Sequence, residues 1–330
     1  MNKVIVITGA SSGIGRSAAV ALGKKGHTLA LIARNENALN EVKAEIVNAG
    51  GSALVIPCDV TESDALAKAA EYIEQELGPI DIWVNCAMAL VFGKFEDVPI
   101  EDYRRVTDVA YHGYVMGTHA ALTRMKKRNK GQIIQIGSAL SYRPLPMQSA
   151  YCGAKHAIRG FTDSLRAELI HEKSAINITA IQFPAINTPL YSWCKLYVDK
   201  EPHPQDPLYD PKLAGEAIVW ATEHPQHREI WVGGIVWLVV LGQKLFPGFS
   251  DWLAAKVSWG GQLTDKTPHP ERQNNLFTTV EGIERRKGRF DKEATTKRPW
   301  LWTVPHQNFW INSSALALLL CAFLLGLIIG

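Results

Sequence analysis

The sequence has few cysteines and little net charge, and both features exclude particular classes of protein. Its five cysteines show neither the pairing of a disulfide framework nor the spacing of a metal site: Cys58, Cys86, Cys152, Cys194 and Cys321. An odd number of cysteines fits a reducing compartment. The net charge of +3 is too small to indicate binding to nucleic acid.

Two kinds of segment are also missing. There is no internal repeat, and no signal peptide precedes the first apolar run, which starts at residue 3. Hydrophobic residues make up 47% of the chain and charged residues 20%, as in an ordinary globular protein. With 330 residues, the chain can form one large α/β domain with additions.

The first 25 residues read as a strand, a glycine-rich turn and a helix. The β-branched run V-I-V-I leads into T-G-A-S-S-G-I-G at residues 8–15. In a dinucleotide-binding turn, Gly9 permits the tight bend, Gly13 lets the backbone approach the pyrophosphate, and Gly15 lets the helix pack on the sheet. The helix N-terminus offers N–H groups to the phosphates. Three more residues of this turn belong to the predicted cofactor site: Ser11, Ser12 and Ile14.

A possible reaction centre lies in residues 138–155. Tyr151 and Lys155 are four residues apart, so on a helix they share one face. A cation near a phenol favours the phenolate, and we expect Lys155 to lower the pKa of Tyr151. Ser138 ends an apolar strand and could donate a hydrogen bond to the same substrate oxygen.

Together these motifs resemble the short-chain dehydrogenase/reductase family over about residues 3–235. The resemblance implies a Rossmann-type α/β fold, a doubly wound parallel sheet of about seven strands. It also implies hydride transfer between nicotinamide and a carbonyl or secondary alcohol. In that family's pattern, Tyr151 is the general acid/base, Lys155 holds the nicotinamide ribose and Ser138 orients the substrate oxygen.

The resemblance assigns further cofactor contacts. Asp59, with Val60 beside it, matches the residue that contacts adenine, and Asn85 follows the fourth strand. Thr188 matches the residue that bonds the nicotinamide carboxamide, in a segment that starts at Pro184.

The sequence departs from the family pattern at three positions. Met88 and Ala185 replace glycines near the nicotinamide. Ala110 stands where the family often has an asparagine that holds a water molecule of a proton relay. We therefore expect the relay to need another partner.

The end of the second strand predicts the choice of cofactor. The family's acidic residue, which binds the 2′-hydroxyl of NAD, is replaced by Ala33, and Arg34 follows. Because a guanidinium is the natural partner of a phosphate, this pair favours NADP(H). The alternative is that Arg34 is a solvated surface residue.

Periodicity gives the remaining elements of the predicted domain, residues 1–235. We expect strands at residues 3–7, 27–34, 52–60, 80–85, 131–137, 175–183 and 228–232. We expect helices at residues 13–25, 35–50, 62–77, 98–128, 149–171 and 211–222. A proline-rich loop at 189–211 carries Tyr191, Trp193, Leu196 and Tyr197, which either close over an apolar substrate or anchor the loop.

Residues 236–308 are predicted to be an extension and a basic linker. Residues 235–245 are apolar, 251–257 look helical, and the chain from 271 has the composition of a linker. Between 285 and 298, basic residues exceed acidic ones by five, which usually marks a solvated face.

The last segment, residues 309–330, is predicted to be a membrane anchor. A helix of this length would reach about 33 Å, enough for the hydrocarbon core. The interface would be occupied by Trp300, Trp302, Phe309 and Trp310, and the basic run would keep the catalytic domain on the cytoplasmic side. The alternatives are a C-terminal helix buried in a dimer interface and a soluble cytoplasmic protein.

These observations predict a membrane-tethered, NADP(H)-dependent oxidoreductase that acts on a lipophilic carbonyl or alcohol. The family resemblance also implies a possible homo-oligomer. Because Met88, Ala110 and Ala185 depart from the pattern, the alternative is a non-catalytic dinucleotide-binding sensor or scaffold at a membrane.

Overall fold

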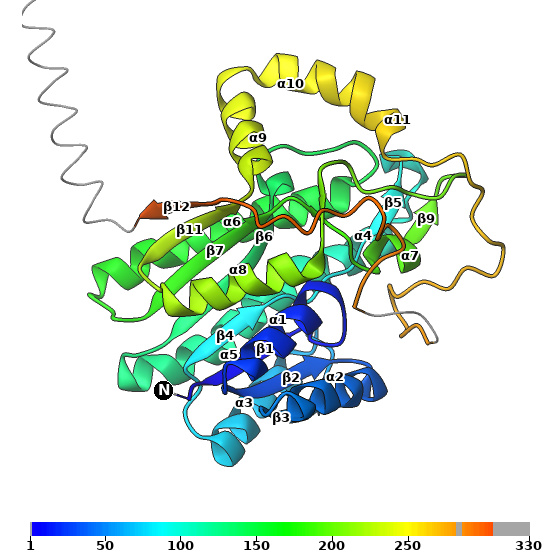
Figure 1. Cartoon of the computed structure of the whole chain (residues 1–330). Helices are drawn as coiled ribbons and strands as arrows, with labels where there is room; N and C mark the ends of the chain where they lie inside the picture. The colour runs from blue at the N-terminus through cyan, green and yellow to red at the C-terminus, as the bar shows by residue number, and fades with distance from the viewer. Residues whose placement is uncertain (1, 282–285, 306–330) are drawn as a thin grey trace, which may run out of the picture.

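A parallel sheet forms the centre of the structure, with helices on both of its faces (Figure 1). The computed structural model describes residues 2–281 and 286–305. Seven strands run parallel in the order β11-β7-β6-β4-β1-β2-β3, and β12 pairs antiparallel with β11 at one edge. The predicted doubly wound parallel sheet is confirmed, and β12 is an eighth strand that the sequence did not reveal.

The strands of the main sheet are β1 (Val4–Thr8), β2 (Thr28–Ala33), β3 (Ser52–Pro57), β4 (Ile82–Asn85), β6 (Gln132–Ser138), β7 (Asn177–Phe183), β11 (His227–Val232) and β12 (Leu301–Pro305). Two short pairs lie beside it, β5 (Val91–Gly93) with β9 (Lys195–Tyr197), and β8 (Ala185–Ile186) with β10 (Leu208–Tyr209).

The α-helices are α1 (Gly13–Lys24), α2 (Glu36–Asn48), α3 (Ser63–Leu77), α4 (Ile100–Thr107), α5 (Gly113–Arg128), α6 (Ser149–His171), α7 (Leu190–Trp193), α8 (Pro211–Glu223), α9 (Gly234–Leu245), α10 (Pro247–Leu253) and α11 (Trp259–Gly261). Single turns of 3₁₀-helix occur at Phe95–Asp97 and Ala139–Ser141, and π-helical turns at Asp108–His112 and Ala254–Ser258.

Apolar side chains on both faces of each strand create two cores. In β1, Ile5 and Ile7 enter the core beneath α1, α2 and α8, while Val6 enters the core beneath α3, α5 and α6. Successive side chains of a strand point to opposite faces, so a continuous β-branched run suits a sheet covered on both sides. This arrangement brings the carboxyl ends of β1, β4 and β6 to one edge, where ligands of such sheets bind.

The single helix predicted at residues 98–128 is divided. α4 and α5 are separated by the π-helical turn Asp108–His112, which contains Ala110. At Gly113, a Cβ atom would lie 2.7 Å from Cγ2 of Val60. The missing side chain therefore lets α5 pass close to a predicted cofactor residue.

The chain from residue 271 is not the linker that its composition predicted. Leu276, Val280 and Phe290 are buried against the domain, and β12 extends its sheet. The basic run also has partners, because Lys287 pairs with Asp210 at 2.8 Å. Three other basic side chains form ion pairs with core carboxylates: Arg286 with Glu45, Arg289 with Glu201, and Arg298 with Glu216.

The predicted anchor at residues 309–330 lies outside the described residues. Within residues 2–281 and 286–305, no helix combines the length and the apolar character that a membrane span requires.

Candidate active site

The glycine-rich turn has the close packing that a dinucleotide site requires. Gly9 and Gly13 have positive φ angles of 69° and 50°, which favour glycine. A Cβ atom on Gly15 would lie 2.2 Å from the carbonyl oxygen of Gly9, so α1 starts directly against the turn. Only glycine fits these positions, and the N-terminus of α1 is left open to a phosphate.

Thr8 joins the turn to the end of β4. Its hydroxyl accepts hydrogen bonds from the backbone N–H groups of Cys86 (3.0 Å) and Ala87 (3.3 Å). The first and fourth strands therefore end at one level beside the cavity.

Asn85 corrects a prediction, because it does not line the cavity. Its side chain is fully buried and donates to Gln135 (2.9 Å) and Thr118 (3.0 Å), while its oxygen accepts from the Trp83 indole. With every polar atom satisfied inside the protein, Asn85 connects β4 to α5 and β6 instead of contacting a cofactor.

The three predicted catalytic residues come together at the middle of the cavity. Ser138 ends β6 and is buried, and Tyr151 and Lys155 lie in the first two turns of α6. Ser138 forms a hydrogen bond with the Tyr151 side chain, and the Lys155 Nζ lies 5.8 Å from the centre of the Tyr151 ring. All three line the cavity, as the spacing predicted.

Lys155 has two polar partners that the sequence did not predict. Its ammonium donates to the carbonyl oxygen of Ile136 at 2.6 Å and to the hydroxyl of Tyr114 at 3.3 Å. The Nζ also lies 4.8 Å from the centre of the Tyr114 ring, a cation–π contact. Tyr114 follows Gly113 directly, so it lies one helical turn beyond Ala110, the position that lacks the family's asparagine.

Burial controls the protonation of this centre. It raises the pKa of Tyr151 well above its usual value, against the opposing effect of the Ser138 hydrogen bond. It lowers the pKa of Lys155 to about 8. The net shift of the Tyr151 pKa is therefore upward and not the expected lowering, because burial outweighs the effect of an ammonium that donates to Ile136 and Tyr114.

One cavity of about 680 Å³ connects the glycine turn to the catalytic residues. It begins at Arg34 and Asp59, passes Gly13 and Thr188, and reaches Tyr151. Beyond Tyr151 it is lined by apolar residues of α9 and the following helices: Leu238, Val239, Phe246, Phe249 and Leu253. All the predicted site residues except Asn85 line it, including Ser11, Ser12, Ile14, Val60 and Pro184.

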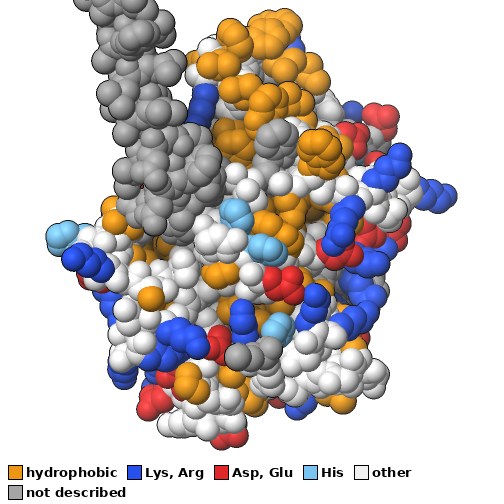
Figure 2. Space-filling model, turned by 60° about the vertical axis from the view of Figure 1, so that its left-hand side comes forward, with side chains coloured by type: hydrophobic (Ala, Val, Ile, Leu, Met, Phe, Trp, Pro, Cys, Tyr) orange, Lys and Arg blue, Asp and Glu red, His pale blue; other side chains and the backbone are white. Residues whose placement is uncertain are grey.

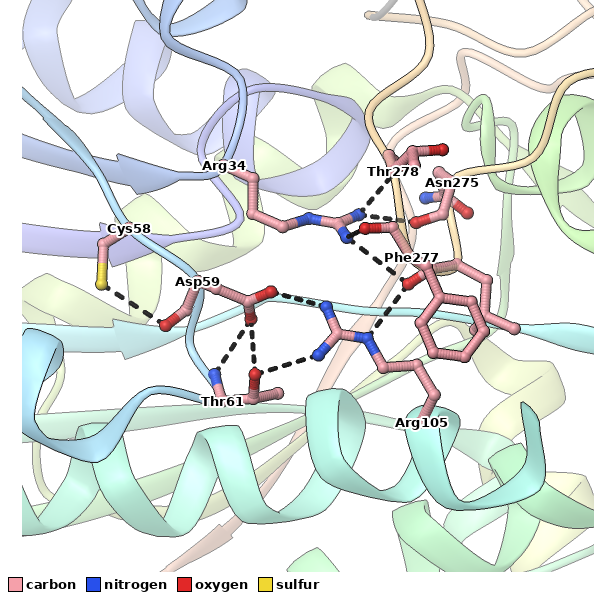
Figure 3. A network of polar contacts seen from close by, with 9 residues as sticks. Arg34, Cys58, Asp59, Thr61, Arg105, Asn275, Phe277 and Thr278 are labelled. Carbon is pink, nitrogen blue, oxygen red and sulfur yellow. Dashed lines mark hydrogen bonds and ion pairs between the residues drawn. The ribbon is translucent and has the colours of Figure 1, made fainter. Parts of the chain in front are cut away.

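Arg34 occupies the polar end, where it is held by backbone of the C-terminal extension (Figure 3). Its terminal nitrogens donate to the carbonyl oxygens of Asn275 (2.5 Å) and Phe277 (2.9 Å), and at 3.4 Å to those of Leu276 and Thr278. Arg34 is half-buried, so it is not the solvated surface residue of the alternative prediction.

Asp59 is fixed beside Arg34 by a second arginine. Arg105 donates to the Asp59 carboxylate at 2.5 Å, to the Thr61 hydroxyl and to the carbonyl oxygen of Leu276 (Figure 3). Burial alone would raise the pKa of Asp59, but hydrogen bonds from Arg105 and Thr61 hold it below its usual value. The ion pair neutralises Asp59, and no carboxylate is paired with Arg34 among the ion pairs of the described residues.

We call residues 275–281 the strap, because they cross the polar end of the cavity. Leu276 is fully buried and Val280 lines the cavity, whereas 53% of Phe277 is exposed. The backbone N–H of Asn275 donates to the Trp193 carbonyl oxygen at 3.0 Å, which connects the strap to the predicted loop. No pattern in the sequence predicts the strap, since its contacts with Arg34 span about 240 residues.

The loop at 189–211 is divided between the cavity and the domain surface. Tyr191 and Trp193 line the cavity. Leu196 and Tyr197 instead lie in β9, which pairs with β5, and the Tyr197 hydroxyl donates to Asp102. The first part of the loop therefore faces the cavity, and the second part anchors the loop to the domain.

The family model for short chain dehydrogenases matches residues 3–193, which include the glycine turn and all three catalytic residues. The chain is a short-chain dehydrogenase. It therefore belongs to a family of oxidoreductases that use a nicotinamide dinucleotide, and the glycine turn and the open N-terminus of α1 fit that cofactor.

Relatives of this short-chain dehydrogenase extend the match beyond the family model. The oxidoreductase YxnA of Bacillus subtilis is 34% identical over 90% of this chain and 86% of its own length. A fatty acyl-CoA reductase of Acinetobacter baylyi is 34% identical over 66% of this chain and 72% of its own. The crystal structure of a short-chain type dehydrogenase/reductase from Mycobacterium marinum superposes with a TM-score of 0.53 at 33% identity, covering 56% of this chain and 75% of that one.

Proposed function

We propose that this short-chain dehydrogenase is an NADP(H)-dependent reductase of lipophilic carbonyl compounds, or an alcohol dehydrogenase in the reverse direction. One observation carries the proposal: a single cavity joins the dinucleotide turn, the Ser138–Tyr151–Lys155 centre and an apolar end.

The residues of this chain have separate roles in the reaction. The bound cofactor would supply the hydride for the carbonyl carbon. Ser138 donates a hydrogen bond to the substrate oxygen, and Tyr151 donates the proton that the oxygen needs as it gains charge. The ammonium of Lys155, held by Ile136 and Tyr114, favours the tyrosinate that remains.

The preference for NADP(H) is supported by the charges at the polar end. Ala33 supplies no acid for a 2′-hydroxyl, and Arg34 donates to backbone carbonyl oxygens and has no ion pair among the described residues. A 2′-phosphate is a stronger partner for a guanidinium than a carbonyl group is. Because both terminal nitrogens of Arg34 are used by the strap, binding the phosphate requires the strap to release them.

Two observations support a lipophilic substrate. Beyond Tyr151 the cavity lining is mostly apolar, with Leu238, Val239 and Phe249, although Ser250 and Ser258 of the same segment also line it. The relative from Acinetobacter baylyi is a fatty acyl-CoA reductase, so an aliphatic substrate occurs among proteins similar to this one.

The sequence of residues 309–330 supports a membrane anchor as part of the same proposal. Residues 315–330 contain no charged side chain, and the 22 residues from Phe309 would be long enough for a tilted or straight span. An anchored reductase would remain close to a lipid-dissolved substrate.

The test is NADPH oxidation by the full-length protein with ketones and aldehydes of increasing chain length. We expect turnover that rises with chain length and is faster with NADPH than with NADH. Tight NADPH binding without turnover of any carbonyl would instead favour the non-catalytic sensor or scaffold.

A further inference from the structure

The surface of residues 234–261 exposes an unusual amount of apolar area. We call this segment the helical arm; it contains α9, α10 and α11 and projects beyond the carboxyl ends of the strands (Figure 1). Of the fifteen exposed large hydrophobic residues in the described chain, nine lie in the arm: Leu238, Leu241, Leu245, Phe246, Phe249, Trp252, Leu253, Val257 and Trp259. Figure 2 shows hydrophobic side chains gathered at this end of the molecule.

The exposed face is held in place by the opposite face of the arm. Val236 and Val240 are buried against Tyr142, and Ala254 and Ser258 are buried as well. Arg143 forms an ion pair with Asp251 at 2.8 Å. The arm is therefore packed on one side, and its aromatic residues are displayed on the other.

The charges of the arm complement an anionic surface. Residues 234–261 contain two lysines and one aspartate. Lys244 and Lys256 are exposed, whereas the charge of Asp251 is balanced by Arg143. Tryptophan and phenylalanine beside lysine are typical of surfaces that lie in the headgroup region of a bilayer.

The apolar face is continuous with the cavity. Leu238, Phe246, Phe249, Leu253 and Val257 are exposed to solvent and also line the cavity that contains Tyr151. Whatever covers the face therefore also covers one mouth of the active site, and a contiguous apolar patch of this kind marks an interaction site.

We propose that the helical arm docks on the surface of an anionic lipid bilayer, with Trp252 and its neighbours in the headgroup region. The cavity mouth then opens toward the acyl chains, and a carbonyl lipid can reach Tyr151 without crossing water. The docking surface is separate from residues 309–330. The substrate part of this inference rests on the proposed function, and the docking itself does not.

A fluorescent label at position 252 tests the docking directly in the full-length chain. Cys321→Ser removes the cysteine of the C-terminal segment, and the other four cysteines are buried. Trp252→Cys then carries an environment-sensitive dye, and Tyr72→Cys on α3, 46% exposed, is the matched control. We expect vesicles of phosphatidylcholine and phosphatidylglycerol to shift the emission at 252 to the blue, and spin-labelled lipid to quench it at least twofold, with neither change at 72.

Two other occupants of the arm would overturn the proposal. If a second copy of the chain covers the arm, the dye at 252 is shielded without vesicles, in a manner that depends on protein concentration. If the chain's own residues 309–330 cover it, the dye is shielded at every concentration. No response at 252, or an equal response at 72, also rules out docking.

Turnover measurements distinguish a failure of docking from a failure of the proposed function. Leu241→Ser/Leu245→Ser/Trp252→Ser changes exposed residues that do not line the cavity, and Val47→Ser/Tyr72→Ser/Ile100→Ser is the matched control. We expect the arm variant to lose at least tenfold in kcat/KM for a carbonyl lipid carried in vesicles, and the control to lose nothing. Equal losses in both variants contradict docking. If the wild type turns over no carbonyl, the proposed function fails while the label still decides the docking.

Discussion

Tyr151, Lys155 and Tyr114 share one buried pocket, and the charge of Lys155 is its most costly feature. The side chain is 3% exposed, and the ammonium is stabilised by a carbonyl oxygen, a hydroxyl and an aromatic ring, without a carboxylate. A buried cation without an anionic partner lowers the stability of the folded state. Placing a cation beside the reacting phenol therefore lowers the stability of the folded protein.

Replacing Lys155 by methionine should stabilise the cofactor-free protein at neutral pH. The lysine pKa falls from 10.5 to about 8 on folding, which corresponds to a cost of about 3 kcal/mol. Between pH 8 and 10.5 the unfolded chain binds more protons, so the free energy of unfolding of the wild type rises with pH. We expect Lys155→Met to be more stable by up to about 3 kcal/mol at pH 7, and its advantage to shrink toward pH 10.5.

Denaturant unfolding at several pH values measures this difference. The same substitution should abolish turnover, since the ammonium is needed for the reaction. A variant that is less stable than the wild type at pH 7, with a gap that does not change up to pH 10.5, would show that burial is not the dominant effect on Lys155.

Tyr114→Phe should change the pH dependence of catalysis and leave the fold intact. It keeps the ring beneath Lys155 but removes the hydroxyl 3.3 Å from Nζ, one acceptor of the charged form. The pKa of Lys155 should then fall further, and the alkaline limb of kcat/KM should move to lower pH. An unchanged profile would mean that Tyr114 does not act on Lys155.

The sequence predicted the residues that depend on local spacing and missed those that depend on distant contacts. Tyr151 and Lys155 share a face because they are four apart in one helix. Asn85 was placed wrongly because Thr118 and Gln135, which hold it, come from other elements. No periodicity in the sequence reports such a contact.

At the scale of elements, Arg34 and the strap form a contact that the proposed cofactor would have to break. The strap uses the terminal nitrogens of Arg34, and a 2′-phosphate would compete for them. Phe277 is exposed, so chymotrypsin cleavage after it reports how firmly the strap is held. We expect NADPH to speed this cleavage and NADH to leave it unchanged.

Arg34→Ala is the control for the competition between the strap and the 2′-phosphate. It should make cleavage at Phe277 fast with or without cofactor, and should weaken binding of NADPH more than that of NADH. If NADPH slows the cleavage in the wild type, the phosphate and the strap do not compete, and the assignment of Arg34 to the 2′-phosphate is wrong.

Most helices and strands could be predicted where a single hydrophobic pattern identifies the element. Continuous, largely apolar runs predicted the seven parallel strands, since both faces of the sheet are covered. The π-helical turn at Asp108–His112 was missed because it preserves the apolar stripe of a single helix. β12 was missed because Leu301–Pro305 is short and its pairing with β11 is set by tertiary contacts.

At the scale of the whole molecule, we propose that two parts of the chain contact the membrane. Residues 309–330 would anchor the chain, and the helical arm would hold the cavity mouth against the bilayer. We expect full-length protein to remain with membranes after high salt and carbonate, and protein without residues 309–330 to be released by high salt. Release of the full-length protein by salt alone would contradict the anchor.

The central claim is that the cavity performs hydride chemistry through Tyr151, and one measurement tests it most directly. NADPH oxidation with a long-chain aldehyde or ketone is followed for the wild type and for Tyr151→Phe, with NADPH binding measured separately. We expect turnover by the wild type, a loss of about 10²–10⁴-fold in the variant, and nearly equal NADPH affinities. A variant that keeps more than about a tenth of the wild-type rate, a loss smaller than proton transfer normally supplies, would contradict this claim.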